Sequence, residues 1–565
     1  MLAADAPPHD RLRDFVASPR LAYLAAVATA IGVVGGVIAL ALLRLIALFT
    51  NVFFFQRVSI ATSVPADAHL GPLIIVVPVL GGLIIGLMAR YGSDRIRGHG
   101  IPEAIEAILI NGSRMQPRVA VLKPLSSAIS IGSGGPFGAE GPIIMTGGAF
   151  GSIVAQFLHL TASERKTLLV AGAAAGMSAT FAAPIAAVLL AVELLLFEWR
   201  PRSLVPVALA SAAAAATRHY LLGNGPLFPV PVHAPFDGVP ALTSCVLVGL
   251  LAGLLSLVLT GAVYLSEDAF GRLPIHWMWW PAIGGLVIGL GGFIFPEALG
   301  VGYGNISTLL NGDATVRLVV GILLVKTAIW SISLGSGTSG GVLAPLLMIG
   351  GALGAVEGTF LPSQGPGFWP LVSMAAVLGG TMRTPLTGTI FALELTHDIN
   401  MLLPVLIATI VAYGFTVVVM RRSILTEKVS RRGFHLSREY SVDPMESLFV
   451  SDVMREPTAS PVGVTATTAA ALANDGDAMD APSNTVAYVG EPLTAVVYRM
   501  AETRQISMPV IDPASEEVVG VIALTDLLAA RRRILDHDNH RERTLRLSVR
   551  YPAFLRRRVI EDGEL

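Results

Sequence analysis

Glu140 is an acidic residue in a setting where a charge is costly. It lies in the phrase GAEGP (138–142), directly before the apolar run IIMTGGAFGSIVAQFL. Pro142 suits the first turn of a helix, which places Glu140 at or next to the N-cap. The first N–H groups of a helix lack intrahelical partners and carry positive partial charge, so such an end binds anions. We therefore expect Glu140 to act as a built-in anion at a helix start.

The phrase around Glu140 recurs 203 residues later without its glutamate. GSGGPFGAEGPIIMTGGAFGS from residue 132 and GSGTSGGVLAPLLMIGGALGA from residue 335 agree at ten of 21 positions, and Leu343 stands where the first copy has Glu140. The similarity extends in both directions and predicts two related halves, about 20–225 and 240–425. It includes four pairs of residues that glycine-rich helices would not align by chance: Lys123/Lys326, Ser130/Ser333, Pro184/Pro385 and Glu193/Glu394.

Two helix starts and one carboxylate suggest a gated anion site. When ionised, Glu140 would occupy the anion position and close the path; when protonated or swung aside, it would leave that position to a diffusible anion. The second start, GVLAP (341–345), has no carboxylate, so its free N–H groups could hold the permeating ion. Gly138 and Gly141 lack side chains that would block an anion from the backbone. The alternative is that Glu140 simply caps a helix at a membrane surface.

A third phrase, GHGIPEAIEA (98–107), has the same form. It places His99, Gly100 and Ile101 at the start of another helix. If His99 faces the anion, its neutral ring would donate one hydrogen bond and its cationic form would attract the ion strongly. The alternative for His99 is a packing role.

The composition predicts an integral membrane protein. Of the 565 residues 53% are hydrophobic and 14% charged, and the mean hydropathy is +0.67, whereas a soluble domain has about a quarter charged residues. An acidic residue such as Glu140 is then a functional candidate by default. Two short glycine-rich runs, 143–158 and 342–356, are typical of broken helices around a site at the membrane midplane. Longer apolar runs, several of them long enough to span a bilayer, cover about 22–49, 71–90, 168–197, 241–266, 278–295, 317–334 and 401–420.

Basic residues on both sides of the apolar region predict cytoplasmic termini. We expect a cytoplasmic N-terminus over 1–20 and a membrane domain over 21–430 with an even number of crossings, in a plasma or inner membrane. The single cysteine, Cys245, excludes an intrachain disulfide and a multi-cysteine metal site. The basic residues before the first run are Arg11, Arg13 and Arg20, and those after the last run are Arg421, Arg422, Lys428, Arg431 and Arg432.

The chain becomes polar after about residue 440. Three β-like runs and a helical pattern between the first two predict a soluble β-α-β-β-α domain over 443–535. Residues 464–484 look like a loose insertion. The basic tail, 536–565, is expected to be a solvated helix or a patch near anionic lipid headgroups. The β-like runs are 485–489, 507–512 and 517–524.

GHGIPE, GAEGP and GVLAP, in this order and within a double repeat, resemble the CLC family of chloride channels and proton-coupled chloride exchangers. The resemblance covers about 20–430. It implies an all-α polytopic homodimer with a separate pore in each subunit, built from two inverted halves of tilted and broken helices. It also implies that Glu140 is the gating glutamate and that the backbone of Val342 and Leu343 binds the anion. The other implied anion contacts are His99, Gly100, Ile101, Gly138, Gly141 and Leu425.

The chain departs from the chloride-transporting pattern at four positions. Serine is usual at His99, phenylalanine at Leu343 and tyrosine at Leu425, so both hydroxyls that normally coordinate the central ion are absent. The proton-relay glutamate of the antiporters falls on Leu194, directly after Glu193, and leucine cannot carry a proton. We therefore expect a channel, with a proton-coupled antiporter as the alternative. We expect chloride as the anion, with fluoride or nitrate as alternatives, because family branches that handle other anions also change the serine.

SDVMRE (451–456), PLTAVVYRMAETRQISMPVID and VVGVIALTDLL resemble the CBS domains that many CLC proteins carry. By this resemblance Asp526 would bind the ribose of ATP or AMP, although Ala523 replaces the usual threonine; a dimer contact without nucleotide is the alternative.

A membrane-anchored nucleotide sensor is the remote alternative for the whole chain. We find no nucleophile–base pair or metal-ligand cluster, so we expect no enzyme, resident metal or other cofactor. The expected partners are the lipid bilayer, small inorganic anions, protons and a second copy of the chain, and no nucleic acid.

Overall fold

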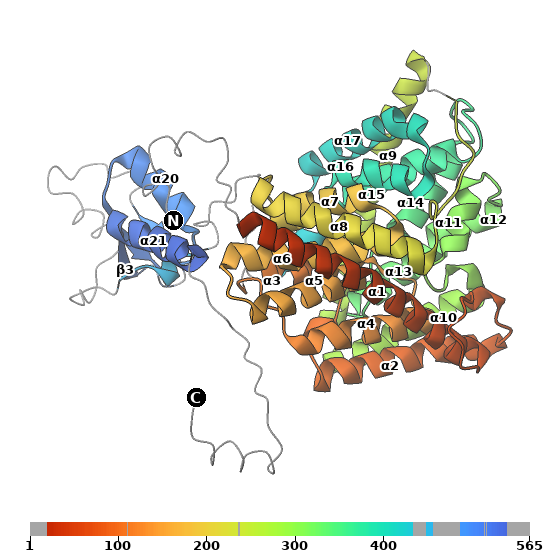
Figure 1. Ribbon diagram of the computed structural model, residues 1–565, viewed down its shortest axis with the longest axis horizontal. Coiled ribbons are helices and arrows are strands. Elements are labelled where there is room, and N and C mark those ends of the chain that lie inside the picture. The colour runs from red at the N-terminus through yellow and green to blue at the C-terminus, as the bar shows by residue number, and fades with distance from the viewer. Residues whose placement is uncertain are drawn as a thin grey trace, which may run out of the picture.

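The computed structural model describes residues 20–109, 111–234, 238–432, 448–455, 486–513, 515 and 517–539, the side chains only to 533. Helices form the membrane domain, and a small α/β module follows it in the chain (Figure 1). The predicted insertion at 464–484 and most of the basic tail, 540–565, lie outside the described residues, as do Arg11 and Arg13.

Eight described α-helices form the first half of the membrane domain. The predicted broken helix 143–158 is the helix α5, which begins inside the protein at Glu140. The helices are α1 (Arg20–Phe55), α2 (Val76–Tyr91), α3 (Ile101–Leu109), α4 (Pro117–Gly132), α5 (Glu140–Phe157), α6 (Ala162–Phe181), α7 (Pro184–Leu190), which continues as a π-helical turn (Ala191–Leu196), and α8 (Pro201–Leu222).

Ten described α-helices form the second half. The predicted broken helix 342–356 is α14, which also begins inside the protein. The helices are α9 (Val239–Gly271), α10 (Trp280–Ile294), α11 (Tyr303–Leu310), α12 (Val316–Gly321), joined through a π-helical turn (Ile322–Lys326) to α13 (Thr327–Gly335), α14 (Leu343–Glu357), α15 (Phe368–Met382), α16 (Pro385–Thr396), α17 (Leu402–Val419) and α18 (Ile424–Arg431).

The apolar run 168–197, long enough for one span, is two helices in the structure. It is divided between α6 and α7, because Ala182 has the left-handed conformation (φ 56°) and Pro184 starts a new helix. Proline has no N–H to continue a helix and disfavours a helical conformation in the residue before it. The chain therefore turns here instead of crossing in one piece.

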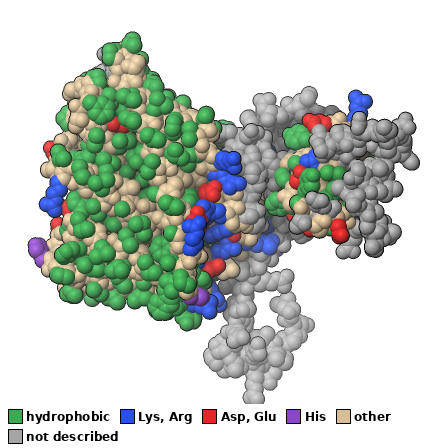
Figure 2. All heavy atoms as spheres, turned by 180° about the vertical axis from the view of Figure 1, so that it is seen from behind, with side chains coloured by type: hydrophobic (Ala, Val, Ile, Leu, Met, Phe, Trp, Pro, Cys, Tyr) green, Lys and Arg blue, Asp and Glu red, His purple; other side chains and the backbone are tan. Residues whose placement is uncertain are grey.

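Six described helical stretches are long and apolar enough to cross a membrane. Figure 2 shows hydrophobic side chains over much of one face of this domain, with charged side chains gathered at the end nearest the C-terminal module. This distribution agrees with a multi-pass membrane protein. The stretches are Arg20–Phe55, Gly71–Tyr91, Leu242–Gly271, Trp277–Ile294, Val316–Gly335 and Ile399–Arg431.

The two halves are related by a local two-fold axis. Gly138 and Gly341, which are equivalent positions in the repeated phrase, form an antiparallel pair. The Gly138 N–H donates to the Gly341 carbonyl at 3.1 Å, and the Gly341 N–H donates to the Gly138 carbonyl at 2.8 Å. Equivalent residues that contact each other reciprocally lie on a two-fold axis. The chain directions of the two halves are therefore opposed at this point.

Helices α2 and α10 pack with the same reciprocity. A Cβ at Gly82 would overlap the carbonyl of Pro281, and a Cβ at Gly285 would overlap the carbonyl of Pro78. These glycines belong to PVLGGLIIGL (78–87) and PAIGGLVIGL (281–290), a part of the repeat that the sequence analysis did not recognise. Close backbone packing through small residues is a common way for membrane helices to associate.

The C-terminal module has the predicted β-α-β-β-α order. Its sheet has the strand order β1-β2-β3; β1 and β2 are parallel, and β2 and β3 are antiparallel with Met508 opposite Ile522. Val496 and Leu527, from the two helices, are buried against the sheet. The elements are β1 (Ala487–Tyr488), α20 (Leu493–Thr503), β2 (Ser507–Ile511), β3 (Val518–Ala523) and α21 (Leu524–Asn539).

Candidate functional site

The N-termini of α3, α5 and α14 converge in the membrane domain. The Gly98 N–H, before α3, donates to the Thr338 carbonyl, before α14, at 3.0 Å, and the Gly138–Gly341 pair joins the loops before α5 and α14. The three phrases singled out in the sequence are thus neighbours in the fold. The positive ends of three helix dipoles meet in one region, which is favourable for an anion.

Glu140 is the first residue of α5, one position inside the N-cap residue Ala139, and it is fully buried. A Cβ at Gly341 would lie 2.6 Å from its Oε2, and a Cβ at Gly138 would overlap the same oxygen. The backbone N–H of Ala344, in the first turn of α14, lies close enough to the Glu140 carboxyl group to interact with it electrostatically. Neither carboxyl oxygen has a hydrogen-bond partner of regular geometry among the described residues. The acid of the first half therefore occupies the helix end of the second half.

The ends of α3 and α5 touch through their backbones. A Cβ at Gly141 would overlap the carbonyl oxygen of His99, so glycine is required at this close approach. His99 is 3% exposed, and its Nδ1 has no hydrogen-bond partner within the described part of the chain. The imidazole thus lies beside the converging helix ends with one ring nitrogen unpaired.

Gly100 and Gly138 contribute space rather than free N–H donors. The Gly100 N–H donates to the Glu103 carboxylate at 3.0 Å, and the Gly138 N–H is used by Gly341. Glu103 is also paired with Lys428 of α18 at 3.3 Å and with Arg432 at 3.1 Å. These ion pairs hold the start of α3 in place, with Ile101 as its first, fully buried residue.

Val342 and Leu343 form the start of α14, as its N-cap and first residue, and both are fully buried. Their N–H groups belong to the helix end that lacks intrahelical acceptors. Leu425 is the second residue of α18, which packs against α3, and it is also fully buried. Leucine has no hydroxyl, and the hydroxyl of nearby Tyr264 is used by the carbonyl of Ile424. Val342, Leu343 and Leu425 can therefore offer an anion only their backbone N–H groups.

Leu194 is fully buried in the π-helical turn after α7, and its neighbour Glu193 has a structural task. Glu193 accepts hydrogen bonds from the N–H groups of Leu386 and Thr387, at 3.2 and 2.8 Å, in the first turn of α16. Glu394 of α16 accepts in the same way from Ile185 and Ala186 in the first turn of α7, at 2.9 and 2.8 Å. The aligned glutamates of the repeat thus cap each other's helices, a role that the sequence analysis missed although their equal positions in the two halves signalled it.

Asp526 lies in the first turn of α21 and is already paired. Its carboxylate accepts from Arg455 Nε at 2.7 Å and from the Ala523 N–H at 3.1 Å. A ribose would have to displace or share these partners. Groups of three or more His, Cys, Asp or Glu suited to a metal ion do not occur among the described residues.

The sequence model of the voltage-gated chloride channel family matches residues 81–417, more than half of the chain. The chain belongs to the voltage-gated chloride channel family. The matched region of this CLC protein includes Glu140, His99, Val342 and Leu343; Leu425 and the α/β module lie beyond it.

Relatives of this CLC protein carry names of both transport types. It is 30% identical to a ClcB-like chloride channel protein of Ralstonia nicotianae, over 60% of this chain and 81% of that protein. It is 29% identical to the H⁺/Cl⁻ exchange transporter ClcA of Salmonella paratyphi B, over 63% and 78%. The structure of a slow cyanobacterial Cl⁻/H⁺ antiporter superimposes with a TM-score of 0.65 at 21% identity, over 74% of this chain and 99% of that one. This superposition establishes the CLC fold of the membrane domain.

Proposed function

We propose that this protein conducts small inorganic anions, chloride above all, as a channel with Glu140 as its proton-sensitive gate. The observation that supports the gate is the position of its carboxylate, which lies over Gly341, the residue directly before the N-cap of α14. An anion at that helix end and the Glu140 carboxylate would compete for the same space and the same positive potential.

The gate follows from the cost of a buried charge. An ionised carboxylate away from water is tolerated where positive groups face it, and the starts of α5 and α14 supply such groups. Protonation of Glu140 removes the negative charge and with it the attraction to these helix ends. An anion that reaches the site then takes the place of the carboxyl group, so that both lower pH and higher anion concentration favour the open path.

Leu194 favours a channel over a proton-coupled antiporter. A relay needs a group that binds and releases protons, and the leucine side chain does neither. Its neighbour Glu193 accepts three hydrogen bonds from Leu386 and Thr387 of α16, including one from the Thr387 hydroxyl at 2.6 Å. These hydrogen bonds hold the Glu193 side chain at the start of α16, which favours a capping role over a mobile proton carrier. Antiport remains the second candidate, because ClcA, which is named an exchanger, is 29% identical to this chain and the ClcB-like channel protein 30%.

The membrane arrangement belongs to the same proposal. Two chains would form a homodimer with one path in each, and both termini would face the cytoplasm in a cell membrane. Apolar side chains exposed on α8, α16 and α17, among them Leu209, Leu386 and Ile410, offer lipid- or partner-facing surface.

Nucleotide binding by a CBS-type module through Asp526 is a separate proposal that Asp526→Ala and a binding titration with ATP and AMP would test.

The reversal potential at two pH values tests the transport type. The protein is placed in a planar bilayer under a chloride gradient, first with equal pH on the two sides and then with a pH difference between them. A channel gives the chloride equilibrium potential in both conditions. A shift of the reversal potential with a proton gradient, or uphill proton movement in liposomes driven by chloride, would instead establish the antiporter. Absence of any anion flux together with tight nucleotide binding would favour the membrane-anchored sensor.

A further inference from the structure

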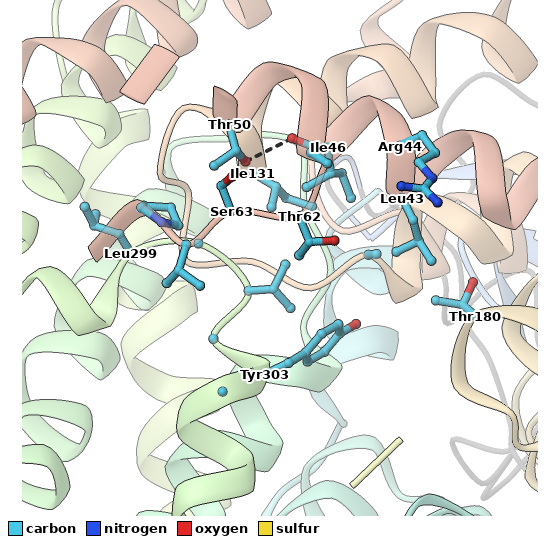
Figure 3. Close-up of a pocket in the computed structure, with 18 of the residues that line it drawn as sticks. Leu43, Arg44, Ile46, Thr50, Thr62, Ser63, Ile131, Thr180, Leu299 and Tyr303 are labelled. Carbon is cyan, nitrogen blue, oxygen red and sulfur yellow. Dashed lines mark hydrogen bonds between the residues drawn. The ribbon is translucent and has the colours of Figure 1, made fainter. Parts of the chain in front are cut away.

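A cavity of about 560 Å³ reaches Ala139, the residue directly before Glu140. Its walls come from the second half of α1 and the loop after it, the ends of α6 and α8, and the loop that leads into α11. Figure 3 shows the ring of Tyr303, from the first turn of α11, among the residues that line this space. His99, Val342 and Leu343 do not line it, so it is distinct from the helix junction described above.

The hydroxyl of Tyr303 is buried without a hydrogen-bond partner among the described residues. The ring itself is held in an edge contact with Phe228, with the centroids 5.8 Å apart. A buried hydroxyl without a partner is costly and calls for an explanation. The carboxyl oxygens of Glu140 are also buried without a hydrogen-bond partner of regular geometry among the described residues. The Tyr303 hydroxyl lies within electrostatic range of this carboxyl group. Two groups able to bond to each other thus lie within electrostatic range, and neither has a hydrogen-bond partner of regular geometry in the described part of the chain.

The internal repeat explains why α11 faces this point. Lys123 donates to two carbonyls of the loop before α3, and Lys326 donates to two carbonyls of the loop before α11, at 2.8–2.9 Å in each case. The two loops are therefore counterparts, and so are the first helical residues, Ile101 of α3 and Tyr303 of α11. By this local symmetry α3 and α11 approach the Glu140 region as equivalent elements of opposite halves. The second half places a hydroxyl where the first has an aliphatic side chain.

We propose that Tyr303 is the hydrogen-bond partner of Glu140 in the open state, holding the carboxyl group in the cavity after it leaves the start of α14. The proposal rests on the proposed gating role of Glu140. A phenolic hydroxyl donates to a carboxylate and accepts from a carboxylic acid, so it can hold either protonation state. The charged groups that line the same cavity are Arg44, Arg218 and Glu297.

The test is a double-mutant cycle on the initial rate of chloride efflux from liposomes at one fixed pH. Tyr303→Phe removes only the hydroxyl, and loss of one hydrogen bond to an ionisable group should lower the rate by about threefold to tenfold. Glu140→Ala has no carboxyl group to hold, so adding Tyr303→Phe to it should leave its rate unchanged. Tyr220→Phe, at a tyrosine that is 86% exposed, serves as the matched control with wild-type behaviour expected.

Each outcome decides between distinct explanations. An equal fractional loss from Tyr303→Phe with and without Glu140 would mean that the hydroxyl serves the permeating anion directly, and the proposal would be wrong. A wild-type rate in Tyr303→Phe would also overturn it. If Glu140→Ala loses transport altogether while folded, the gating role itself fails, which is a different result from failure of the Tyr303 contact alone.

Discussion

The Oε2 atom of Glu140 lies 2.6 Å from the position that a Cβ on Gly341 would occupy. Glu140 begins α5 in the first half, and Gly341 lies before α14 in the second, so a side chain of one repeat fills the place in front of the other repeat's helix end. Leu343, the counterpart of Glu140, has no charge to do the same in return. The two equivalent helix starts thus carry one acidic group between them, and the proposed gate rests on this asymmetry.

Removal of the Glu140 carboxyl group should leave the path open. We expect Glu140→Ala and Glu140→Gln to retain anion flux and to lose its dependence on pH, because the competing charge is gone in both. Flux measured in liposomes across a series of pH values checks this. Glu357→Gln, at a fully buried glutamate at the far end of α14, should keep the pH dependence and serves as control. A folded Glu140→Ala protein without flux would contradict the gate.

Gly138→Ala should force the carboxyl group away from the start of α14. The three nearest atoms to a Cβ at this position all belong to the Glu140 side chain, so the clash is with that side chain and not with backbone. We expect higher flux at neutral pH than in the wild type, and no further effect of Gly138→Ala in a Glu140→Ala background.

Gly141→Ala is the matched control for that experiment. Its Cβ would overlap the His99 carbonyl, which is backbone and cannot move aside cheaply. It should destabilise the protein by about 1–3 kcal/mol whether or not Glu140 is present. Thermal unfolding in detergent measures this, and equal behaviour of the two alanine variants would show that Gly138 does not act through Glu140.

His99→Ser should change the choice among anions. If the unpaired Nδ1 of His99 faces the ion, replacing the ring changes one hydrogen bond, worth about 1 kcal/mol or about fivefold in a permeability ratio. Reversal potentials in mixtures of chloride with nitrate or fluoride give these ratios, and the pH response should shift as well. Unchanged ratios and an unchanged pH response would assign His99 to packing.

Glu193→Gln and Glu394→Gln should have similar effects on stability. Each removes the charge from a carboxylate that accepts two N–H groups at a helix start, at a cost of about 1–3 kcal/mol. Thermal unfolding should show comparable losses, and neither variant should alter proton movement. Loss of proton transport in Glu193→Gln alone, without loss of stability, would show that Glu193 carries protons and would support the antiporter.

The sequence by itself determined the membrane class, the duplication and the three glycine phrases. The duplication was detectable because glycine, proline and glutamate each have a specific backbone or capping function that few other residues can replace. For the same reason Glu140 could be assigned to a helix start before its surroundings were known. Pro184 is a sequence signal for a helix break within the 168–197 run, but the continuous apolar composition of the run led to the prediction of a single stretch.

Only the tertiary structure decided what these residues face. Hydrogen bonds between Gly138 and Gly341, or from Glu193 to α16, join positions about 200 residues apart, and no local pattern specifies such partners. Tyr303 shows this most clearly, since the sequence around it, GVGYGNIS, contains no pattern that assigns this aromatic residue a function. It becomes a candidate partner of Glu140 because the packing of the two halves leaves its hydroxyl buried, without a hydrogen-bond partner among the described residues, and within electrostatic range of the Glu140 carboxyl group.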